Sequence, residues 1–157
     1  MKIGIAGEVC SFPLKEMVKE HLIEQGYEVV DMGMISEDDP QVFYNTAPKV
    51  ARAIQSGEID RGIVMCGTGM GVCLICNKFK GVYCALAESA TTARLHRVIN
   101  RTNVLSMGGW IAGKLTAFDM VDGWLNATIG EGFDEGRRKV QADGYARIQD
   151  IEAENFK

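Results

Sequence analysis

The chain has 157 residues, of which 46% are hydrophobic and 24% are charged, and its formal net charge at pH 7 is −4. These values predict one compact domain with a single core. The absence of a Lys/Arg run and of any apolar stretch long enough to span a bilayer argues against a nucleic-acid-binding surface and against a membrane protein.

Strands and helices alternate along the chain. Apolar runs predict strands at residues 2–7, 27–32, 63–66, 82–87 and 104–107. Helical spacing of apolar residues predicts helices at about 14–25, 46–55, after the turn at 67–71, from 91, at 114–126 and from 135 onward. Continuous apolar strands separated by helices are typical of a parallel sheet covered on both faces. The sequence therefore predicts one doubly wound α/β domain over residues 1–157.

The last predicted helix, at about 135–153, differs from the others. It begins with the polar run Glu135-Gly136-Arg137-Arg138-Lys139, and its apolar stripe is thin, consisting of Val140, Tyr145, Ile148 and Ile151. We expect this extended helix to pack on a partner subunit. The alternative is a solvated surface helix.

The cysteines indicate a reducing compartment. Their number, five, is odd, and the chain starts directly on a strand without a signal peptide, so we expect a cytoplasmic protein. Cys73 and Cys76 have the spacing of a metal or redox pair, but they lie in an apolar run, and neither His21 nor His96 has a paired spacing. We therefore expect core cysteines and no metal site.

The turn after the third predicted strand, residues 66–71, has the sequence Cys-Gly-Thr-Gly-Met-Gly and leads into a helix. Its glycines let backbone N–H groups converge on an anion, and the positive end of the helix points at the same place. Such a turn can stabilise a phosphate or the oxygen of an enediolate. It is not a Walker loop, and no complete G-x-G-x-x-G follows the first strand, so a nucleotide cofactor is not expected.

Cys66 immediately precedes these N–H groups, which favour a thiolate, so we expect a depressed pKa for its thiol. A thiolate there can act as a nucleophile or as a general base beside a carbonyl. A phosphatase would need an arginine closing the loop, and none is present. The alternative is a buried strand-end cysteine without a catalytic role. Other candidates stand at the ends of the remaining strands, where ligands of parallel sheets bind: Glu8, Glu88 and Gly108-Gly109.

The turn at 66–71, with Asn77-Lys78 and the later Asn100-x-x-Asn103-Val104, resembles the ribose-5-phosphate isomerase type B family, which includes the galactose-6-phosphate isomerase subunits. The resemblance covers Lys2 to about Ile151. It implies a Rossmann-like three-layer α/β/α fold with a five-stranded parallel sheet. It also implies a homodimer or homotetramer with active sites shared between subunits, and cofactor-free aldose–ketose exchange of a small phosphorylated sugar through a cis-enediolate.

The resemblance also implies roles for individual residues. Cys66 matches the base that takes the proton from carbon, and Thr68 matches the hydroxyl that assists proton transfer at the sugar oxygens. Glu8 is placed to bind sugar hydroxyls. The remaining substrate contacts are the anion hole of Gly67, Gly69, Met70 and Gly71, the aromatic Phe43, and, from the neighbouring subunit, Asn100 and Arg137, with Arg138 as a further phosphate contact.

The chain departs from the family pattern at several positions, among them Glu8 in place of an aspartate and Phe43 in place of a tyrosine. Val9 stands where ribose isomerases carry a phosphate-binding histidine, Ile99 replaces the histidine that opens the sugar ring, and Gln141 replaces a phosphate arginine. His96, nearly one turn before Ile99, could serve instead or could be an ordinary surface histidine. A tetrose with phosphate on O4 cannot close a five-membered ring and needs no ring-opening acid. We therefore expect a preference for an acyclic tetrose phosphate such as erythrulose phosphate.

Three other interpretations stay open. The chain could be a ribose-5-phosphate isomerase proper, or the cysteine-bearing subunit of a galactose-6-phosphate isomerase that a paralogous subunit completes. It could also be a sugar-phosphate-binding regulator without catalysis, which would have no need of Cys66.

Overall fold

The computed structural model describes residues 1–156 and contains one five-stranded sheet. All paired strands are parallel, and their order across the sheet is β2-β1-β3-β5-β4. The strands are β1 (Lys2–Ala6), β2 (Glu28–Asp31), β3 (Arg61–Cys66), β4 (Cys84–Leu86) and β5 (Val104–Gly108). The chain leaves β1 toward one edge to form β2 and returns to the other side of β1 to form β3, so the order reverses between β1 and β3. In open α/β sheets a ligand crevice lies at such a reversal, beyond the carboxyl ends of the strands.

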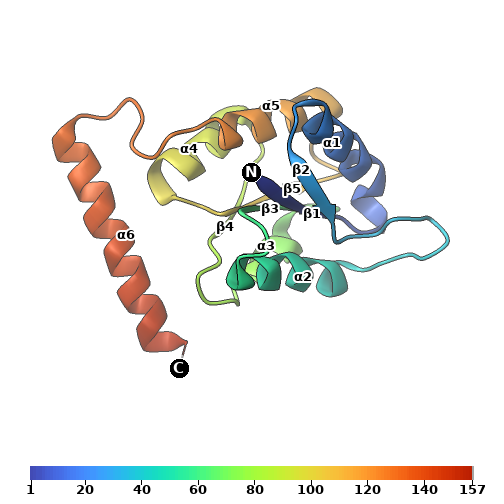
Figure 1. The fold of residues 1–157 in the computed structure, drawn as a ribbon, viewed down its shortest axis with the longest axis horizontal. Coiled ribbons are helices and arrows are strands. Elements are labelled where there is room, and N and C mark those ends of the chain that lie inside the picture. The colour runs from blue at the N-terminus through green and yellow to red at the C-terminus, as the bar shows by residue number, and fades with distance from the viewer. Residues whose placement is uncertain (157) are drawn as a thin grey trace.

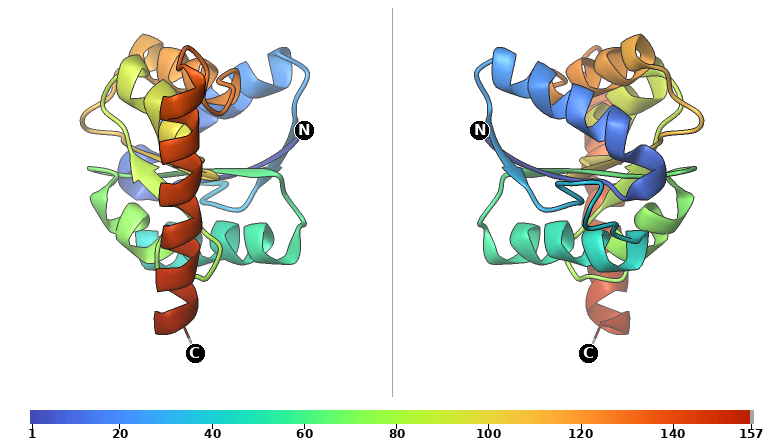
Figure 2. Two further views of the ribbon diagram at one scale, coloured as in Figure 1. Left: turned by 90° about the vertical axis from the view of Figure 1, so that its left-hand side faces the viewer. Right: turned by 90° about the vertical axis from the view of Figure 1, so that its right-hand side faces the viewer.

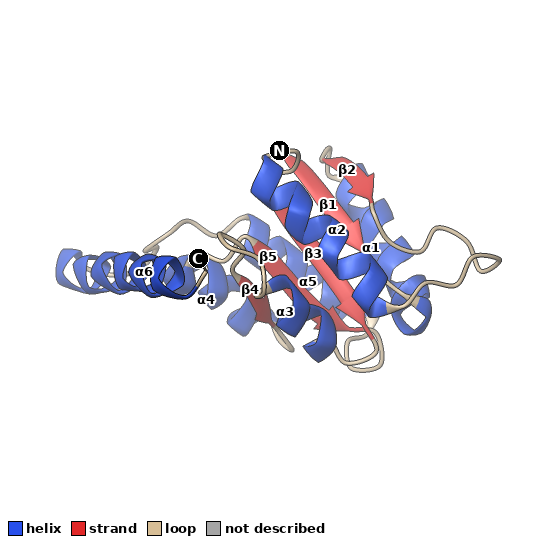
Figure 3. Cartoon of the chain, turned by 90° about the horizontal axis from the view of Figure 1, so that it is seen from below, coloured by secondary structure: helices blue, strands red, loops and turns tan. Residues whose placement is uncertain are grey.

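Helices cover both faces of the sheet (Figure 2). On one side lie α1 (Phe12–Glu24), α4 (Ala90–Asn100) and α5 (Lys114–Leu125), and on the other lie α2 (Phe43–Ser56) and α3 (Met70–Cys76). Figure 3 shows α2 and α3 lying over the strands. Each face has its own core: Ile3, Ile5 and Leu105 belong to the cluster under α1 and α5, and Val64 and Val104 to the cluster under α2 and α3. The predicted three-layer fold is confirmed.

The sequence misplaced two helix starts. A short 3-10 helix at Val9–Ser11 leads into α1, which begins at Phe12 rather than at residue 14. The second helix begins at Phe43, three residues before the expected start, and Pro48 lies inside it. The early start matters because it carries the Phe43 ring to the carboxyl end of the sheet, where the ring lies against Gly71.

The last helix, α6 (Glu135–Asn155), stands beside the body of the domain (Figure 1). None of residues 135–155 is buried, and Val140, Ile148 and Ile151 are exposed. Glu152 ties the helix to the segment before β4, because its carboxylate accepts hydrogen bonds from the Gly81 N–H (2.7 Å) and the Tyr83 hydroxyl (3.0 Å). Burial and this carboxylate raise the pKa of Tyr83, which keeps the hydroxyl protonated as the donor.

Candidate active site

A cavity of about 300 Å³ opens at the carboxyl ends of β1 and β3, where the strand order reverses. It is lined by Glu8, Cys10, Phe43, Cys66, Gly67, Thr68, Gly71 and Trp110. Glu8 follows β1 closely, Cys66 ends β3, and Trp110 follows β5. We call this cavity the Cys66 cleft.

Cys66 is only 7% exposed, yet it borders the cleft rather than facing solely into the core. Its sulfur accepts a hydrogen bond from the backbone N–H of Gly69 at 3.2 Å. This contact holds the sulfur at the edge of the cleft, beside the backbone of the turn.

Gly69 can direct its N–H at the sulfur because its backbone is left-handed, with φ of 79°. This conformation costs a residue with a Cβ about 1–2 kcal/mol but costs glycine little. A second contact holds the turn in place: the buried Ser106 hydroxyl on β5 donates a hydrogen bond to the Gly69 carbonyl at 2.5 Å. The position of the Cys66 sulfur thus depends on a turn that only glycine adopts readily.

Two further glycines of the turn let aromatic rings approach the backbone. A Cβ on Gly67 would lie 2.8 Å from the Trp110 ring, and one on Gly71 would lie 2.9 Å from the Phe43 ring. The loop after β5 is hydrogen-bonded to the turn, since the N–H groups of Gly109 and Trp110 donate to the carbonyls of Cys66 and Gly67. The cleft therefore has two aromatic walls, and Trp110 remains 70% exposed at its mouth.

Polar groups face the cleft on either side of Cys66. Thr68 accepts a weak hydrogen bond from the Met70 N–H at 3.4 Å, which leaves its hydroxyl free to donate. Glu8 is 7% exposed, and its Oε1 atom is buried without a hydrogen-bond partner among residues 1–156. Burial and the negative charge of Glu8 raise the pKa of the neighbouring Cys10 thiol, so Cys10 stays protonated. Cys66 is therefore the better placed of the two thiols to act as a base.

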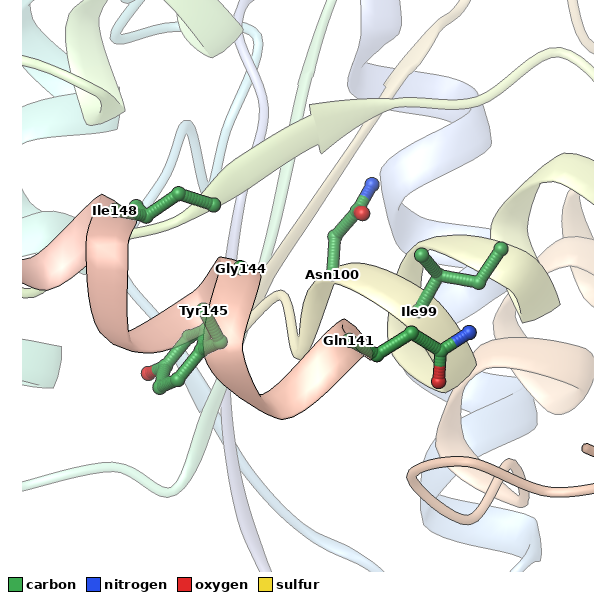
Figure 4. A pocket seen from close by; sticks show the side chains of 6 residues that line it. All are labelled: Ile99, Asn100, Gln141, Gly144, Tyr145 and Ile148. Carbon is green, nitrogen blue, oxygen red and sulfur yellow. The ribbon is translucent and has the colours of Figure 1, made fainter. Parts of the chain in front are cut away.

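The other candidate residues lie elsewhere in the chain. Asn100 ends α4 and lines a separate cavity of about 160 Å³ between α4 and α6, with Ile99, Gln141, Gly144, Tyr145 and Ile148 (Figure 4). Both amide atoms of Gln141 are buried without a hydrogen-bond partner within the described chain. Within one chain, therefore, the structure brings Glu8, Phe43, Thr68 and the glycine turn to Cys66, but not Asn100.

The predicted phosphate contacts lie at the start of α6. Arg138 lines a cavity of about 450 Å³ together with Arg101 and Lys139, whereas Arg137 is exposed and holds its guanidinium over the Phe133 ring at 5.8 Å. His96 donates its Nε2–H to the Leu86 carbonyl at 2.9 Å and lines a third cavity with Glu88, away from Cys66. Among residues 1–156, no Lys or Arg side chain lines the Cys66 cleft.

Sequence reasoning missed Cys10 and Trp110. Cys10 lies in the 3-10 helix after β1, and Trp110 follows the Gly108-Gly109 pair that the sequence did indicate. Neither has a motif of its own; their position next to two strand ends was the available signal. Cys73 was also misjudged in part, because Cys76 and Cys84 are buried but Cys73 is only half-buried.

No group of three or more His, Cys, Asp or Glu side chains within residues 1–156 could hold a metal ion. Over the same residues, no helix has the length and apolar character needed to cross a bilayer.

Comparison with known proteins places the chain among isomerases. Residues 3–142 match the family model described as Ribose/Galactose Isomerase, and the chain belongs to that family. It is 40% identical over 152 residues to the 4-deoxy-4-sulfo-D-erythrose isomerase of Clostridium sp. (strain MSTE9), covering 97% of this chain and 96% of the relative. It is 28% identical over 150 residues to the D-erythrulose-4-phosphate isomerase of Pectobacterium atrosepticum, with 96% and 97% covered.

Among solved structures, ribose-5-phosphate isomerase B of Clostridium thermocellum superposes with a TM-score of 0.88 at 36% identity, covering 98% of this chain and 99% of that one. The resemblance inferred from the turn at 66–71 is thereby confirmed.

Proposed function

We propose that this member of the isomerase family interconverts the aldose and ketose forms of a tetrose that carries an anionic group on C4. The observation that carries the proposal is the Cys66 sulfur, which borders the cleft and accepts the Gly69 N–H at 3.2 Å. A thiolate there removes the proton from the carbon next to the carbonyl, and the resulting cis-enediolate is held by the turn and by Thr68. The proton then returns to the neighbouring carbon.

The substrate's carbon number is proposed from Ile99. An aldotetrose whose C4 carries phosphate or sulfonate has no free O4, so it stays open-chain and needs no acid to open a ring. Ile99 cannot supply such an acid. Two similar relatives are named for C4-substituted tetroses, one a sulfonate and one a phosphate, which supports this interpretation.

Two uncharged residues bear on the charge of the substrate anion. Val9 and Gln141 stand where the family resemblance leads us to expect a histidine and an arginine. A sulfonate carries one negative charge, whereas a phosphate monoester carries about 1.5 to 2 at pH 7. Fewer cations suit the smaller charge, so we infer that a 4-sulfotetrose is preferred over the corresponding phosphate.

The site is proposed to be completed by a second copy of the chain. Asn100, Arg137 and Arg138 lie away from the Cys66 cleft of their own chain, and α6 exposes Val140, Ile148 and Ile151. A neighbouring α4–α6 unit would add the amide and the cations that the cleft lacks. A paralogous subunit is the second candidate for this role, favoured by the same division of the site.

The test is a set of kcat/KM values for the purified full-length protein with 4-deoxy-4-sulfo-D-erythrose, D-erythrose 4-phosphate and D-ribose 5-phosphate. We expect both tetroses to exceed the pentose by at least about tenfold, a difference of about 1.4 kcal/mol in transition-state binding. Faster turnover of ribose 5-phosphate would refute the tetrose proposal. Cys66→Ala should lower kcat at least about 100-fold, and full activity in that variant would refute the role of the base.

A further inference from the structure

The Cys66 cleft holds one buried carboxylate oxygen that has no hydrogen-bond partner among residues 1–156. Glu8 Oε1 has no hydrogen-bond partner among residues 1–156, although the side chain is more than nine-tenths buried and lines the cleft. Leaving a buried polar atom unpaired costs about 1–3 kcal/mol, and more for a charged group. Such an atom is available to pair with a ligand group that enters the cleft.

An aldose–ketose isomerisation moves two protons, one between carbons and one between oxygens. Cys66 accounts for the first. The second requires a group that can accept a proton from O2 and deliver it to O1, both of which lie on the same side of a cis-enediol.

Three residues that line the cleft have side chains that ionise in the ordinary range, namely Glu8, Cys10 and Cys66. Cys66 is occupied with the carbon proton. Cys10 stays protonated beside Glu8, because burial and the charge of Glu8 raise its pKa. Thr68 can hold a substrate oxygen, but a hydroxyl does not ionise at neutral pH.

Building on the proposed isomerase activity, we propose that Glu8 is a second catalytic residue, which carries the hydroxyl proton between O2 and O1 of the enediolate. Starting from the aldose, the Cys66 thiolate takes the C2 proton, a C1=C2 double bond forms, and the carbonyl electrons pass to O1. The Glu8 carboxylate accepts the proton of the O2 hydroxyl and gives it to O1. The O2 electrons then form the C2 carbonyl, and C1 takes the proton from the Cys66 thiol. Both side chains end as they began.

This assignment differs from a role in binding, because Glu8 would act after Cys66 has already broken the C–H bond. Removing the carboxylate should therefore separate two measurable processes. Exchange of the substrate's carbon-bound proton with deuterated water depends on Cys66 alone. Net conversion of aldose to ketose depends on both residues.

The test variant is Glu8→Gln, which keeps the shape and a hydrogen-bonding group but cannot carry the proton. We expect kcat for conversion to fall about 100-fold or more while KM changes less than about threefold. Deuterium should still enter the recovered substrate, so the ratio of conversion to exchange falls. Glu58→Gln, an exposed carboxylate that precedes β3 at the opposite end of the sheet, is the matched control and should leave both rates unchanged.

Equal losses of exchange and conversion in Glu8→Gln would overturn the proposal, because they would indicate a binding or positioning role, and retention of both rates would overturn it as well. If Glu8→Gln fails to fold, Glu8→Ala with added formate serves instead. Conversion restored by formate supports the relay, and absence of rescue in a folded Glu8→Ala protein contradicts it. The isomerase proposal itself is tested separately, since Cys66→Ala must abolish exchange whatever the Glu8 variants do.

Discussion

Gly69→Ala should damage both the stability and the activity of the protein, because Gly69 lies where the turn is left-handed and closely packed. A Cβ at this position would sit 2.6 Å from Leu86 Cδ1 and 2.7 Å from the Met107 carbonyl carbon. The left-handed backbone costs alanine about 1–2 kcal/mol. Crowding against the β5 backbone, which cannot rotate away, adds about 1–3 kcal/mol. The free energy of unfolding of Gly69→Ala is therefore expected to be lower by about 2–5 kcal/mol.

Gly57→Ala is the matched control, because Gly57 has φ of 73° but an added Cβ would meet nothing within 4 Å. Its free energy of unfolding should fall only by the cost of the left-handed backbone, about 1–2 kcal/mol. At about 2–4 °C per kcal/mol for a chain of this size, Gly69→Ala should melt about 2–12 °C below Gly57→Ala in a thermal unfolding scan.

The same pair of variants separates stability from catalysis. Gly69→Ala shifts the N–H that the Cys66 sulfur accepts, so kcat should fall about 100-fold, comparable to removal of one oxyanion-hole donor. Gly57→Ala should keep its activity at temperatures where it is folded. Equal melting temperatures for the two variants, or an unchanged kcat in folded Gly69→Ala, would refute the reasoning.

Three further variants test other parts of the molecule. Ile99→His should raise kcat/KM for ribose 5-phosphate relative to a tetrose by about tenfold, since it supplies a ring-opening acid; an unchanged ratio in a substrate panel would contradict the role given to Ile99. Thr102→Val leaves the buried Trp124 indole N–H without its 2.9 Å acceptor and should cost about 1–3 kcal/mol in urea unfolding, whereas an unaltered midpoint would show that the bond contributes nothing. Hydrogen bonding with Cys84 lowers the pKa of Cys73 to about 7, so its alkylation by iodoacetamide, followed by peptide mass spectrometry, should level off by about pH 8. Asn77→Ala, which removes a second hydrogen bond to the Cys73 sulfur, should move the pH profile of alkylation to higher pH. If the alkylation rate of Cys73 in the unmodified protein still climbs above pH 8, as it does for an ordinary thiol, the lowered pKa of Cys73 is contradicted.

The sheet could be predicted from the sequence because each of its buried strands is a short apolar run followed by glycine or a polar residue. Ile63-Val64-Met65 shows the pattern clearly, and the glycine turn that follows identifies the site as well. Strand ends in a parallel sheet meet at one edge, so Glu8 and Cys66 could be expected to lie close together even though they are 58 positions apart in the sequence.

The walls of the cleft could not be predicted in the same way. Trp110 lies over Gly67 only because the loop after β5 folds back and hydrogen-bonds to the turn after β3, a contact between distant segments. The buried Oε1 of Glu8, which has no hydrogen-bond partner among residues 1–156, is likewise a property of the packed structure, since no pattern in the sequence shows which carboxylate oxygens are paired. The periodicity of apolar residues predicts which face of a helix or strand a residue lies on. The position of Trp110 and the hydrogen bonding of Glu8 depend instead on contacts between loops that are distant in the sequence.

The loose attachment of α6 has a consequence for the motions of a single chain. A 21-residue helix with no buried residue gains little from packing, and Gly144 in its interior disfavours the helix by about 1 kcal/mol relative to alanine. Its amide protons should therefore exchange with solvent far faster than those of β3 and β5. Because Glu152 is anchored at Gly81 and Tyr83, fraying of α6 would release the segment that leads into β4 and loosen that edge of the sheet first.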